Sequence, residues 1–170
     1  MDLKTYIRDV VDFPKPGIIY KDITPLLQHP EALRKALADL KASIGGLQID
    51  KVVGVESRGF IFASMLAVEL QAGFVMIRKA NKLPFKTLAE TYSLEYGQDQ
   101  VEIHQDYIKR GDRVLLHDDV LASGGTAYAA VRLIEKLGGE VVQCNFLLEL
   151  VNLKGRKRLG EKEVFSLLSF

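Results

Sequence analysis

The sequence predicts an α/β fold in which a parallel sheet is flanked by helices. Two observations predict this class. Short runs rich in β-branched residues alternate along the chain with longer segments whose apolar residues recur every three or four positions. Strands that alternate with crossing helices assemble into a parallel sheet. The chain has 170 residues, of which 48% are hydrophobic, so we expect one domain over residues 1–170 with a core of ordinary size.

The first half of the chain begins this alternation. Pro30 can occupy the first position of a helix, and Gly45 and Gly46 can end it. The apolar residues between them recur at helical spacing and are Leu33, Leu37, Leu40 and Ile44. The next three segments are predicted as a buried strand, a helix and a second strand, over residues 51–56, 60–70 and 74–79.

The second half repeats the pattern with one exception. Residues 113–119 predict a strand, residues 126–137 a helix that Gly138 ends, and residues 140–150 another strand. Residues 91–96 and 101–104 instead alternate in period two around the turn sequence GQDQ, which predicts an antiparallel hairpin. A projecting hairpin is either a lid or an ordinary edge hairpin, and the pattern alone leaves both open.

Composition and charge argue against several classes of protein. Twenty-three Lys and Arg against 22 Asp and Glu leave a formal charge of +1, which argues against broad electrostatic attraction to nucleic acid or a membrane surface. No apolar run approaches the roughly 20 residues that cross a bilayer, and the N-terminal residues lack the apolar stretch of a signal peptide. We therefore expect a cytoplasmic protein. The single cysteine, Cys144, excludes an internal disulfide and lies in an apolar run typical of core packing.

The strongest chemical signal is the segment VLLHDDVLASGGTA, from Val114 to Ala127. A hydrophobic strand leads to two adjacent carboxylates, Asp118 and Asp119, and then to a turn of small residues that opens the next helix. Glycines let the backbone approach an anion, and free amides at a helix N-terminus favour phosphate. Carboxylates beside a phosphate would repel it unless they serve hydroxyls or a metal ion. A sugar phosphate such as ribose 5-phosphate meets both conditions.

Simpler interpretations exist for the same residues. A GGT turn alone is more often a tight connection between strand and helix, and a basic group such as Arg78, Lys79 and Lys82 is more often solvated surface. The turn is not a Walker loop, because no lysine follows the glycines, and it lacks the G-x-G-x-x-G pattern of dinucleotide binding. Paired aspartates also occur in phosphoryl-transfer receiver domains, but that interpretation leaves the glycine turn unexplained.

The motifs, in their order along nearly the whole chain, resemble those of the type I phosphoribosyltransferases, which use 5-phospho-α-D-ribose 1-diphosphate (PRPP). The sugar-phosphate segment is similar to the signature of the whole family. The segments DFPKPGIIYKDITPLL and YSLEYG are similar to the branch that acts on adenine, and GVESRGFIF, IRKANKLP and LVNLKGRKRL fit the same pattern. The resemblance implies the fold of that family, with a small N-terminal hood over residues 1–28 and a flexible antiparallel flap over residues 81–105.

The resemblance also implies a role for each matching residue. The ribose hydroxyls would be held by Asp118 and Asp119, and the 5-phosphate by Ala122, Ser123, Gly124, Gly125 and Thr126. The diphosphate would lie on the turn formed by Glu56, Ser57, Arg58 and Gly59, with a cis peptide between the first two, and beside Arg78, Lys79 and Lys82. Adenine would contact Ile19, Tyr20 and Lys21 in the hood, and Leu150 after the last long strand. Glu95 in the flap would handle a ring proton of the base, with Tyr96 beside it.

The implied reaction joins adenine to PRPP and releases AMP and diphosphate, as in purine salvage. Mg²⁺ would be held mainly by the substrate and water, with no metal cage made of protein residues. A homodimer is implied, with no nucleic-acid or membrane partner, and the basic run LKGRKRL over residues 153–159 is expected as solvated surface or dimer contact. Two alternatives stay open. One is a phosphoribosyltransferase for another base, such as hypoxanthine, guanine or xanthine, and the other is a non-catalytic regulator that keeps the PRPP fold and binds nucleic acid.

Overall fold

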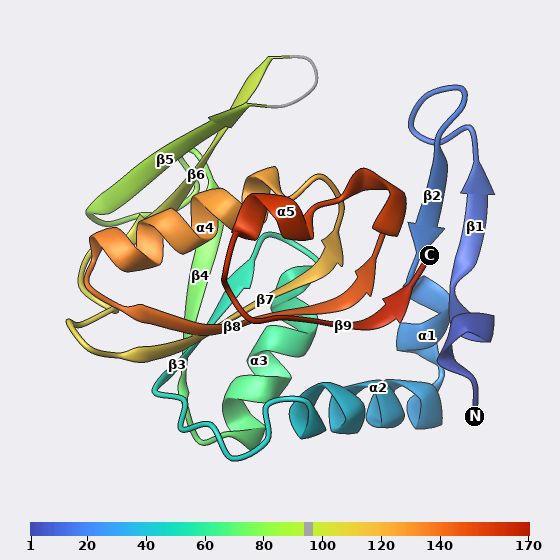
Figure 1. Cartoon of the computed structure of the whole chain (residues 1–170), viewed down its shortest axis with the longest axis horizontal. Coiled ribbons are helices and arrows are strands. Elements are labelled where there is room, and N and C mark those ends of the chain that lie inside the picture. The colour runs from blue at the N-terminus through green and yellow to red at the C-terminus, as the bar shows by residue number, and fades with distance from the viewer. Residues whose placement is uncertain (94–96) are drawn as a thin grey trace. The chain divides into compact units, whose positions relative to one another are not determined.

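The structure is a computed structural model that describes residues 1–93 and 97–170, and these residues form two compact units, Met1–Asp39 and Leu40–Phe170. The N-terminal unit holds the 3₁₀ turn η1 (Leu3–Tyr6), β1 (Arg8–Val11), β2 (Ile19–Asp22), α1 (Thr24–Gln28) and most of α2 (Pro30–Ala42) (Figure 1). Strands β1 and β2 pair antiparallel, with Asp9 opposite Lys21. The expectation of one domain over residues 1–170 stays a prediction.

Helix α2 begins at Pro30 as predicted, and Leu40 and Ile44 are buried as expected, but the first half of its buried face differs from the expected one. Ala32, Ala36 and Leu40 are fully buried, whereas Leu33 and Leu37 are half-buried. In this first half, the buried stripe is therefore turned by about one residue from the predicted stripe. The small alanine side chains let neighbouring atoms approach the helix axis closely, and a pattern weighted toward large apolar residues does not register them.

A mixed sheet forms the centre of the second unit. The strands follow the order β5-β6-β4-β3-β7-β8-β9 across it. Neighbours are parallel from β4 to β9, through β4 (Gly73–Lys79), β3 (Lys51–Val55), β7 (Arg113–Leu121), β8 (Glu140–Glu149) and β9 (Val164–Ser169). Strands β5 (Thr87–Ser93) and β6 (Gln98–His104) pair antiparallel and extend the sheet from β4. This arrangement confirms the predicted α/β class with an antiparallel hairpin.

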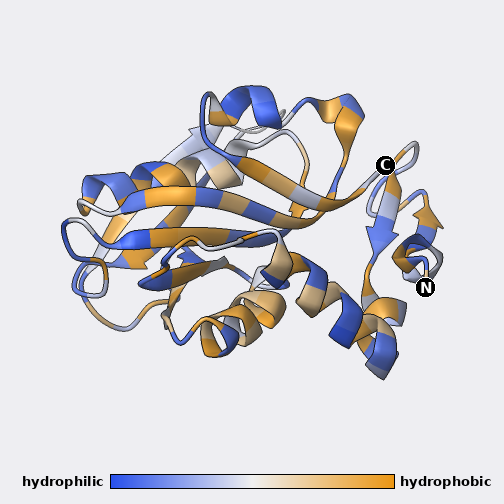
Figure 2. Cartoon of the chain, turned by 60° about the horizontal axis from the view of Figure 1, so that its bottom comes forward, coloured by the Kyte–Doolittle hydropathy of each residue, from blue (hydrophilic) through white to orange (hydrophobic). Residues whose placement is uncertain are grey.

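Helices cover both faces of this sheet. Helix α3 (Gly59–Glu69) lies on one face, and α4 (Gly125–Lys136) and the short α5 (Arg156–Leu159) lie on the other (Figure 1). The strands carry long hydrophobic stretches (Figure 2), and the core joins residues of the central strands to Ala130 and Ile134 of α4. Cys144 is fully buried in this core, and burial raises the pKa of its thiol to about 12. The cysteine is therefore a packing residue, as its apolar neighbours predicted.

Several predicted strand boundaries were wrong, and β1, β2 and β9 were not predicted as strands. Strand β5 begins at Thr87, four residues before the predicted start at residue 91. The sequence GQDQ was expected as a turn, but β6 begins at Gln98 because Asp99 pairs with Tyr92 across the hairpin. Strand β7 continues beyond Asp119 to Leu121. Strand β9, parallel to β8, was not predicted, because most of its residues are half-buried and it shows little periodicity. The predicted cis peptide between Glu56 and Ser57 is confirmed, and a second cis peptide joins Phe13 to Pro14.

Candidate active site

The predicted site residues of the second unit follow the carboxyl ends of three neighbouring strands. Glu56 comes directly after β3, Arg78 and Lys79 end β4, and Asp118 and Asp119 lie near the end of β7. In the sheet these strands are adjacent in the order β4-β3-β7. Because parallel strands end at the same edge of a sheet, the fold gathers these residues where ligands bind in open α/β sheets.

A pocket of about 70 Å³ lies where β7 gives way to α4. It is lined by Asp118, Val120, Leu121, Ala122, Ser123, Gly124, Gly125, Thr126 and Ala127. The residues predicted to hold a 5-phosphate, 122–126, all belong to this lining, and we call them the phosphate cradle. Gly124 caps the helix without a side chain, so the first amides of α4 keep their hydrogen-bonding capacity for a ligand.

Two glycines let the cradle sit against the segment after β8. Gly124 has a φ of 83°, and a Cβ there would lie 2.6 Å from the carbonyl oxygen of Gly155. A Cβ on Gly155 would lie 2.3 Å from the carbonyl oxygen of Ala122. Neither position accepts a side chain without movement of the backbone.

The predicted surface role of residues 153–159 is therefore incomplete. Gly155 and Leu159 are buried, and Arg156 donates to both carboxylate oxygens of Glu149, at 2.9 and 2.8 Å. Arg158 lies beside the cradle, since a Cβ on Gly125 would come within 3.3 Å of its Nη1. The glycine inside a basic run was the one sequence signal for this packing.

Asp118 and Asp119 lie in a buried environment that disfavours the ionised form of both carboxyls. Burial raises the pKa of both carboxyls, and the neighbouring charge of Asp119 raises that of Asp118 further. Arg58 opposes the rise at Asp119, because its Nε lies 2.6 Å from Asp119 Oδ2. Among the described residues, no hydrogen bond of standard geometry adds to this ion pair at the buried Asp119 Oδ2. Hydroxyl donors or a cation at this place would stabilise the ionised pair.

The residue before this pair was not predicted to matter. His117 is fully buried, and its Nδ1 lies 2.9 Å from Asn145 Oδ1. Burial lowers the pKa of His117 to about 4, so the ring is neutral at physiological pH. It therefore adds no positive charge beneath the two aspartates.

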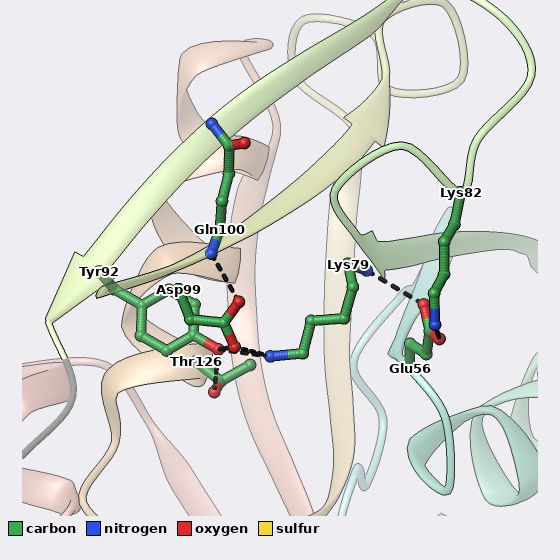
Figure 3. A network of polar contacts seen from close by, with 7 residues as sticks. All are labelled: Glu56, Lys79, Lys82, Tyr92, Asp99, Gln100 and Thr126. Carbon is green, nitrogen blue, oxygen red and sulfur yellow. Dashed lines mark hydrogen bonds and ion pairs between the residues drawn. The ribbon is translucent and has the colours of Figure 1, made fainter. Parts of the chain in front are cut away.

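Glu56 forms ion pairs with two of the predicted basic residues, Arg78 and Lys82. Its carboxylate accepts hydrogen bonds from Arg78 Nε at 3.1 Å and from the backbone amide of Lys79 at 3.0 Å, and it pairs with the Lys82 ammonium. Figure 3 shows the contacts with Lys79 and Lys82. Burial alone would raise the pKa of Glu56, but these donors hold it below its ordinary value. Glu56 is thus an ionised anchor for the cations rather than a direct partner for an anion.

The side chain of Lys79 takes another direction. Its ammonium pairs with Asp99 of β6 and donates to Tyr92 Oη of β5 at 3.0 Å, and Thr126 Oγ1 of the cradle donates to the same Tyr92 oxygen at 3.0 Å (Figure 3). Tyr92 and Asp99 were not predicted as site residues. Their positions in a hairpin gave no signal, because their partners come from distant parts of the chain.

The residues predicted for the base lie on both units or outside the described residues. Ile19, Tyr20 and Lys21 belong to β2, and the Lys21 ammonium lies 2.7 Å from Asp9 Oδ1. Leu150 follows β8 and donates its amide to the carbonyl of Leu121 at 2.9 Å. Glu95 and Tyr96 lie outside the described residues.

Within residues 1–93 and 97–170, no cluster of three or more His, Cys, Asp or Glu side chains could hold a metal ion. No helix of the described chain is long and apolar enough to span a membrane.

Comparison with known proteins adds the family. Residues 22–169 match the phosphoribosyl transferase domain. The adenine phosphoribosyltransferase of Flavobacterium johnsoniae is 58% identical over 170 residues, which cover 100% of both chains. The crystal structure of adenine phosphoribosyltransferase from Rhodothermus marinus has a TM-score of 0.95 at 58% identity and covers 99% of this chain and 96% of its own.

A further solved structure was determined with ligands bound. The Saccharomyces cerevisiae adenine phosphoribosyltransferase, complexed with an imino-altritol bisphosphate and adenine, has a TM-score of 0.92 at 40% identity, with 98% and 96% of the two chains covered. The strand-end carboxylates, the phosphate cradle and these likenesses over the full chain agree. The chain belongs to the phosphoribosyltransferase family, within its adenine phosphoribosyltransferase branch.

Proposed function

We propose that this chain transfers the 5-phosphoribosyl group of PRPP to adenine and releases AMP and diphosphate, a purine-salvage reaction. The observation that carries the proposal is the pair Asp118–Asp119 placed directly before a phosphate-sized pocket at the N-terminus of α4. Carboxylates and unpaired amides at this spacing suit the two ends of a ribose 5-phosphate. Membership in the family and the adenine-binding relatives point to the same reaction.

The cradle would hold the 5-phosphate through backbone amides and hydroxyls. The amides of the first turn of α4 and the positive end of its dipole favour a dianion. Ser123 and Thr126 add hydroxyl groups at the rim. The ribose hydroxyls would then donate to Asp118 and Asp119, and this removes the unfavourable burial of the bare carboxylates.

Arg58, Arg78, Lys79 and Lys82 would face the diphosphate. The bond between the anomeric carbon and the diphosphate oxygen breaks, and the electron pair leaves with the diphosphate. Positive charge develops on the ribose ring while negative charge gathers on the leaving group. Cations fixed in advance by Glu56 stabilise that negative charge without reorganisation during the step.

The residues present also fit Mg²⁺ held mainly by the substrate. Mg²⁺ prefers oxygen ligands and usually retains water, with one or two carboxylates and substrate phosphates completing its shell. Asp118 and Asp119 supply carboxylates beside the ribose position, and a cation or its water shell would offset the burial that raises the pKa of both carboxyls. When bound, Mg²⁺ would neutralise charge on the leaving diphosphate.

The base would attack the anomeric carbon as the diphosphate leaves. A bond forms from a ring nitrogen of adenine to that carbon, and the proton on the nitrogen passes to the carboxylate of Glu95. Flap closure would exclude water, which would otherwise react with the ribose cation. Backbone groups at Ile19 and Lys21, with Tyr20 and Leu150, would contact the adenine ring and discriminate against 6-oxo purines.

Two further expectations rest on the resemblance. We propose a homodimer and a cytoplasmic location, and analytical ultracentrifugation of the purified chain tests the first. A dissociation constant well above micromolar would contradict a stable dimer.

The decisive assay measures product formation with PRPP and Mg²⁺ for each base. We expect AMP from adenine at a kcat/KM at least 100-fold above that for IMP from hypoxanthine, because unsatisfied polar groups in a base pocket cost a factor on the order of 10⁴. Faster formation of IMP would assign the chain to another base. No nucleotide from any purine would refute the proposed reaction.

A further inference from the structure

Lys79 contacts both Glu56, on the turn after β3, and the strands β5 and β6, which we call the flap strands. Its backbone amide donates to Glu56 Oε2 at 3.0 Å, while its ammonium lies between Asp99 and the hydroxyl of Tyr92 (Figure 3). Tyr92 and Asp99 are paired directly across β5 and β6. The ammonium therefore points toward the flap strands and the phosphate cradle, rather than toward Glu56.

The Tyr92 hydroxyl is the centre of this cluster. It lies 3.0 Å from Lys79 Nζ, 3.0 Å from Thr126 Oγ1 and 3.1 Å from Asp99 Oδ2. A phenol has one proton to donate and two lone pairs to accept with. Three partners therefore use the full hydrogen-bonding capacity of the Tyr92 hydroxyl.

The direction of each hydrogen bond follows from the partners. An ammonium only donates, so Tyr92 accepts from Lys79. An ionised carboxylate only accepts, so Tyr92 gives its single proton to Asp99. Although burial would raise the pKa of Asp99, the hydrogen bonds from Lys79, the Gln100 amide and Tyr92 lower it, so the carboxylate is ionised at neutral pH.

Thr126 must then donate its only hydroxyl proton to Tyr92. In this state its hydroxyl presents lone pairs alone to the cradle, and lone pairs repel a phosphate dianion. For Thr126 to donate to a 5-phosphate, its bond to Tyr92 has to break. Likewise, Lys79 reaches a phosphate group only in competition with the Asp99 carboxylate.

We propose that Tyr92 and Asp99 are positioning residues that hold Thr126 and Lys79 in a resting arrangement against which phosphate ligands compete. This inference rests on the proposed function, because it assigns the cradle to a ribose 5-phosphate. The arrangement weakens binding of the phosphate groups, and it hastens the release of AMP. It also couples the strands of the flap to occupation of the cradle, since Tyr92 and Asp99 both lie on those strands.

The two residues make distinguishable predictions. Tyr92→Phe removes the acceptor that occupies Thr126 but leaves the ion pair of Lys79 and Asp99. It should tighten binding of AMP and ribose 5-phosphate and leave the affinity for Mg²⁺-diphosphate unchanged. Asp99→Asn removes a negative charge beside the cradle together with the charge that competes for Lys79, so it should tighten binding of all three anionic ligands.

The test measures dissociation constants of the full chain for these ligands by isothermal titration calorimetry. We expect roughly tenfold tighter AMP binding in Tyr92→Phe, the effect of one hydrogen bond to a charged group. The kcat should fall as AMP release slows, while kcat/KM for PRPP is retained or rises. The matched controls are Tyr107→Phe and Asp106→Asn, both at exposed positions outside the cluster, and they should change none of these constants.

A double-variant cycle separates this role from simple packing. In a Thr126→Ala background, Tyr92→Phe should no longer tighten AMP binding, because the hydroxyl it frees is absent. Unchanged or weaker AMP binding in both Tyr92→Phe and Asp99→Asn would overturn the inference, and Asp99→Asn alone decides it if Tyr92→Phe fails to fold. If the wild-type chain forms AMP but neither variant binds AMP more tightly, this inference alone is contradicted. If the wild-type chain forms no AMP, the proposed function is contradicted.

Discussion

The phosphate cradle and the neighbouring basic cluster of Arg78, Lys79 and Lys82 would both meet phosphate groups, yet they are built differently. The cradle uses small residues and the first amides of α4, with Gly124 at a φ of 83°. The cations of the cluster are instead paired with Glu56 or Asp99. A ligand therefore finds the first amides of α4 prepared in the cradle, where only Thr126 has to leave Tyr92. In the cluster it has to displace the internal pairs of the cations. We expect the cradle to set affinity, and the cluster and flap to set turnover.

The largest expected effect is on turnover, and it tests whether the flap sets turnover rather than affinity. Glu95→Gln removes the proposed proton acceptor while keeping the size of the side chain. Because general acid–base groups contribute a factor of about 10² to 10⁴, kcat should fall by that order while the dissociation constant for PRPP stays within about twofold. Pre-steady-state rates and PRPP titrations measure the two quantities. Unchanged turnover would remove Glu95 from the mechanism.

The second prediction tests the division at the cradle. Gly124→Ala adds a Cβ that would lie 2.6 Å from the carbonyl oxygen of Gly155, at a positive φ that costs about 1 to 2 kcal/mol for an L-residue. We expect PRPP and AMP to bind roughly 100-fold more weakly, since a shift of the loop misaligns several amides at once. Gly111→Ala is the control, because Gly111 has a φ of 87° with open space around it. Equal losses in both variants would show that backbone strain alone is responsible.

The third prediction concerns the pH dependence of stability that arises from His117, the residue directly before Asp118 and Asp119. The folded-state pKa of about 4 lies below the ordinary 6.5, so the unfolded chain binds more protons between these values. Stability is fully present above the unfolded pKa and falls as the pH drops toward the folded one. Between about pH 7 and about pH 5, the titration of His117 should lower the free energy of unfolding by about 2 kcal/mol.

Urea unfolding of wild type and His117→Gln at both pH values measures this loss. The difference between the two pH dependences isolates the histidine, because the remaining titratable groups are common to both chains. Identical pH dependences would show that the ring is not held neutral by burial.

The contrast between the two regions also explains what the sequence could predict. The segment VLLHDDVLASGGTA is local, so a strand, two carboxylates and a glycine turn occur together and are recognisable without a structure. The fold gathers the ends of β3, β4 and β7 as the alternation of elements predicts. The roles assigned to single residues remain predictions until ligands are bound.

The parts that sequence reasoning missed depend on contacts between distant segments. Tyr92 and Thr126 are 34 positions apart, and Lys79 and Asp99 are 20 apart. No periodicity encodes such pairs. Strand β9 was missed because its pairing with β8, and not its own pattern, makes it a strand. Gly155 gave a weak signal, since its need for close approach arises only when the cradle packs against it.

The smallest expected effect concerns the segment around Gly155, which packs against the phosphate cradle. Arg156 holds Glu149 with two hydrogen bonds and donates to the carbonyl of Val164 at 2.6 Å, which fixes the segment behind Gly124. Because this arginine is 47% exposed, water screens the pair, and Arg156→Ala should lower stability by about 1 kcal/mol. AMP affinity should fall by a few fold as Gly155 loosens against Ala122.

Lys157→Ala, the exposed neighbour on α5, is the control for loss of positive charge. If both variants weaken AMP binding equally, net charge rather than support of the cradle explains the loss. If neither does, the cradle holds its shape without the segment behind it.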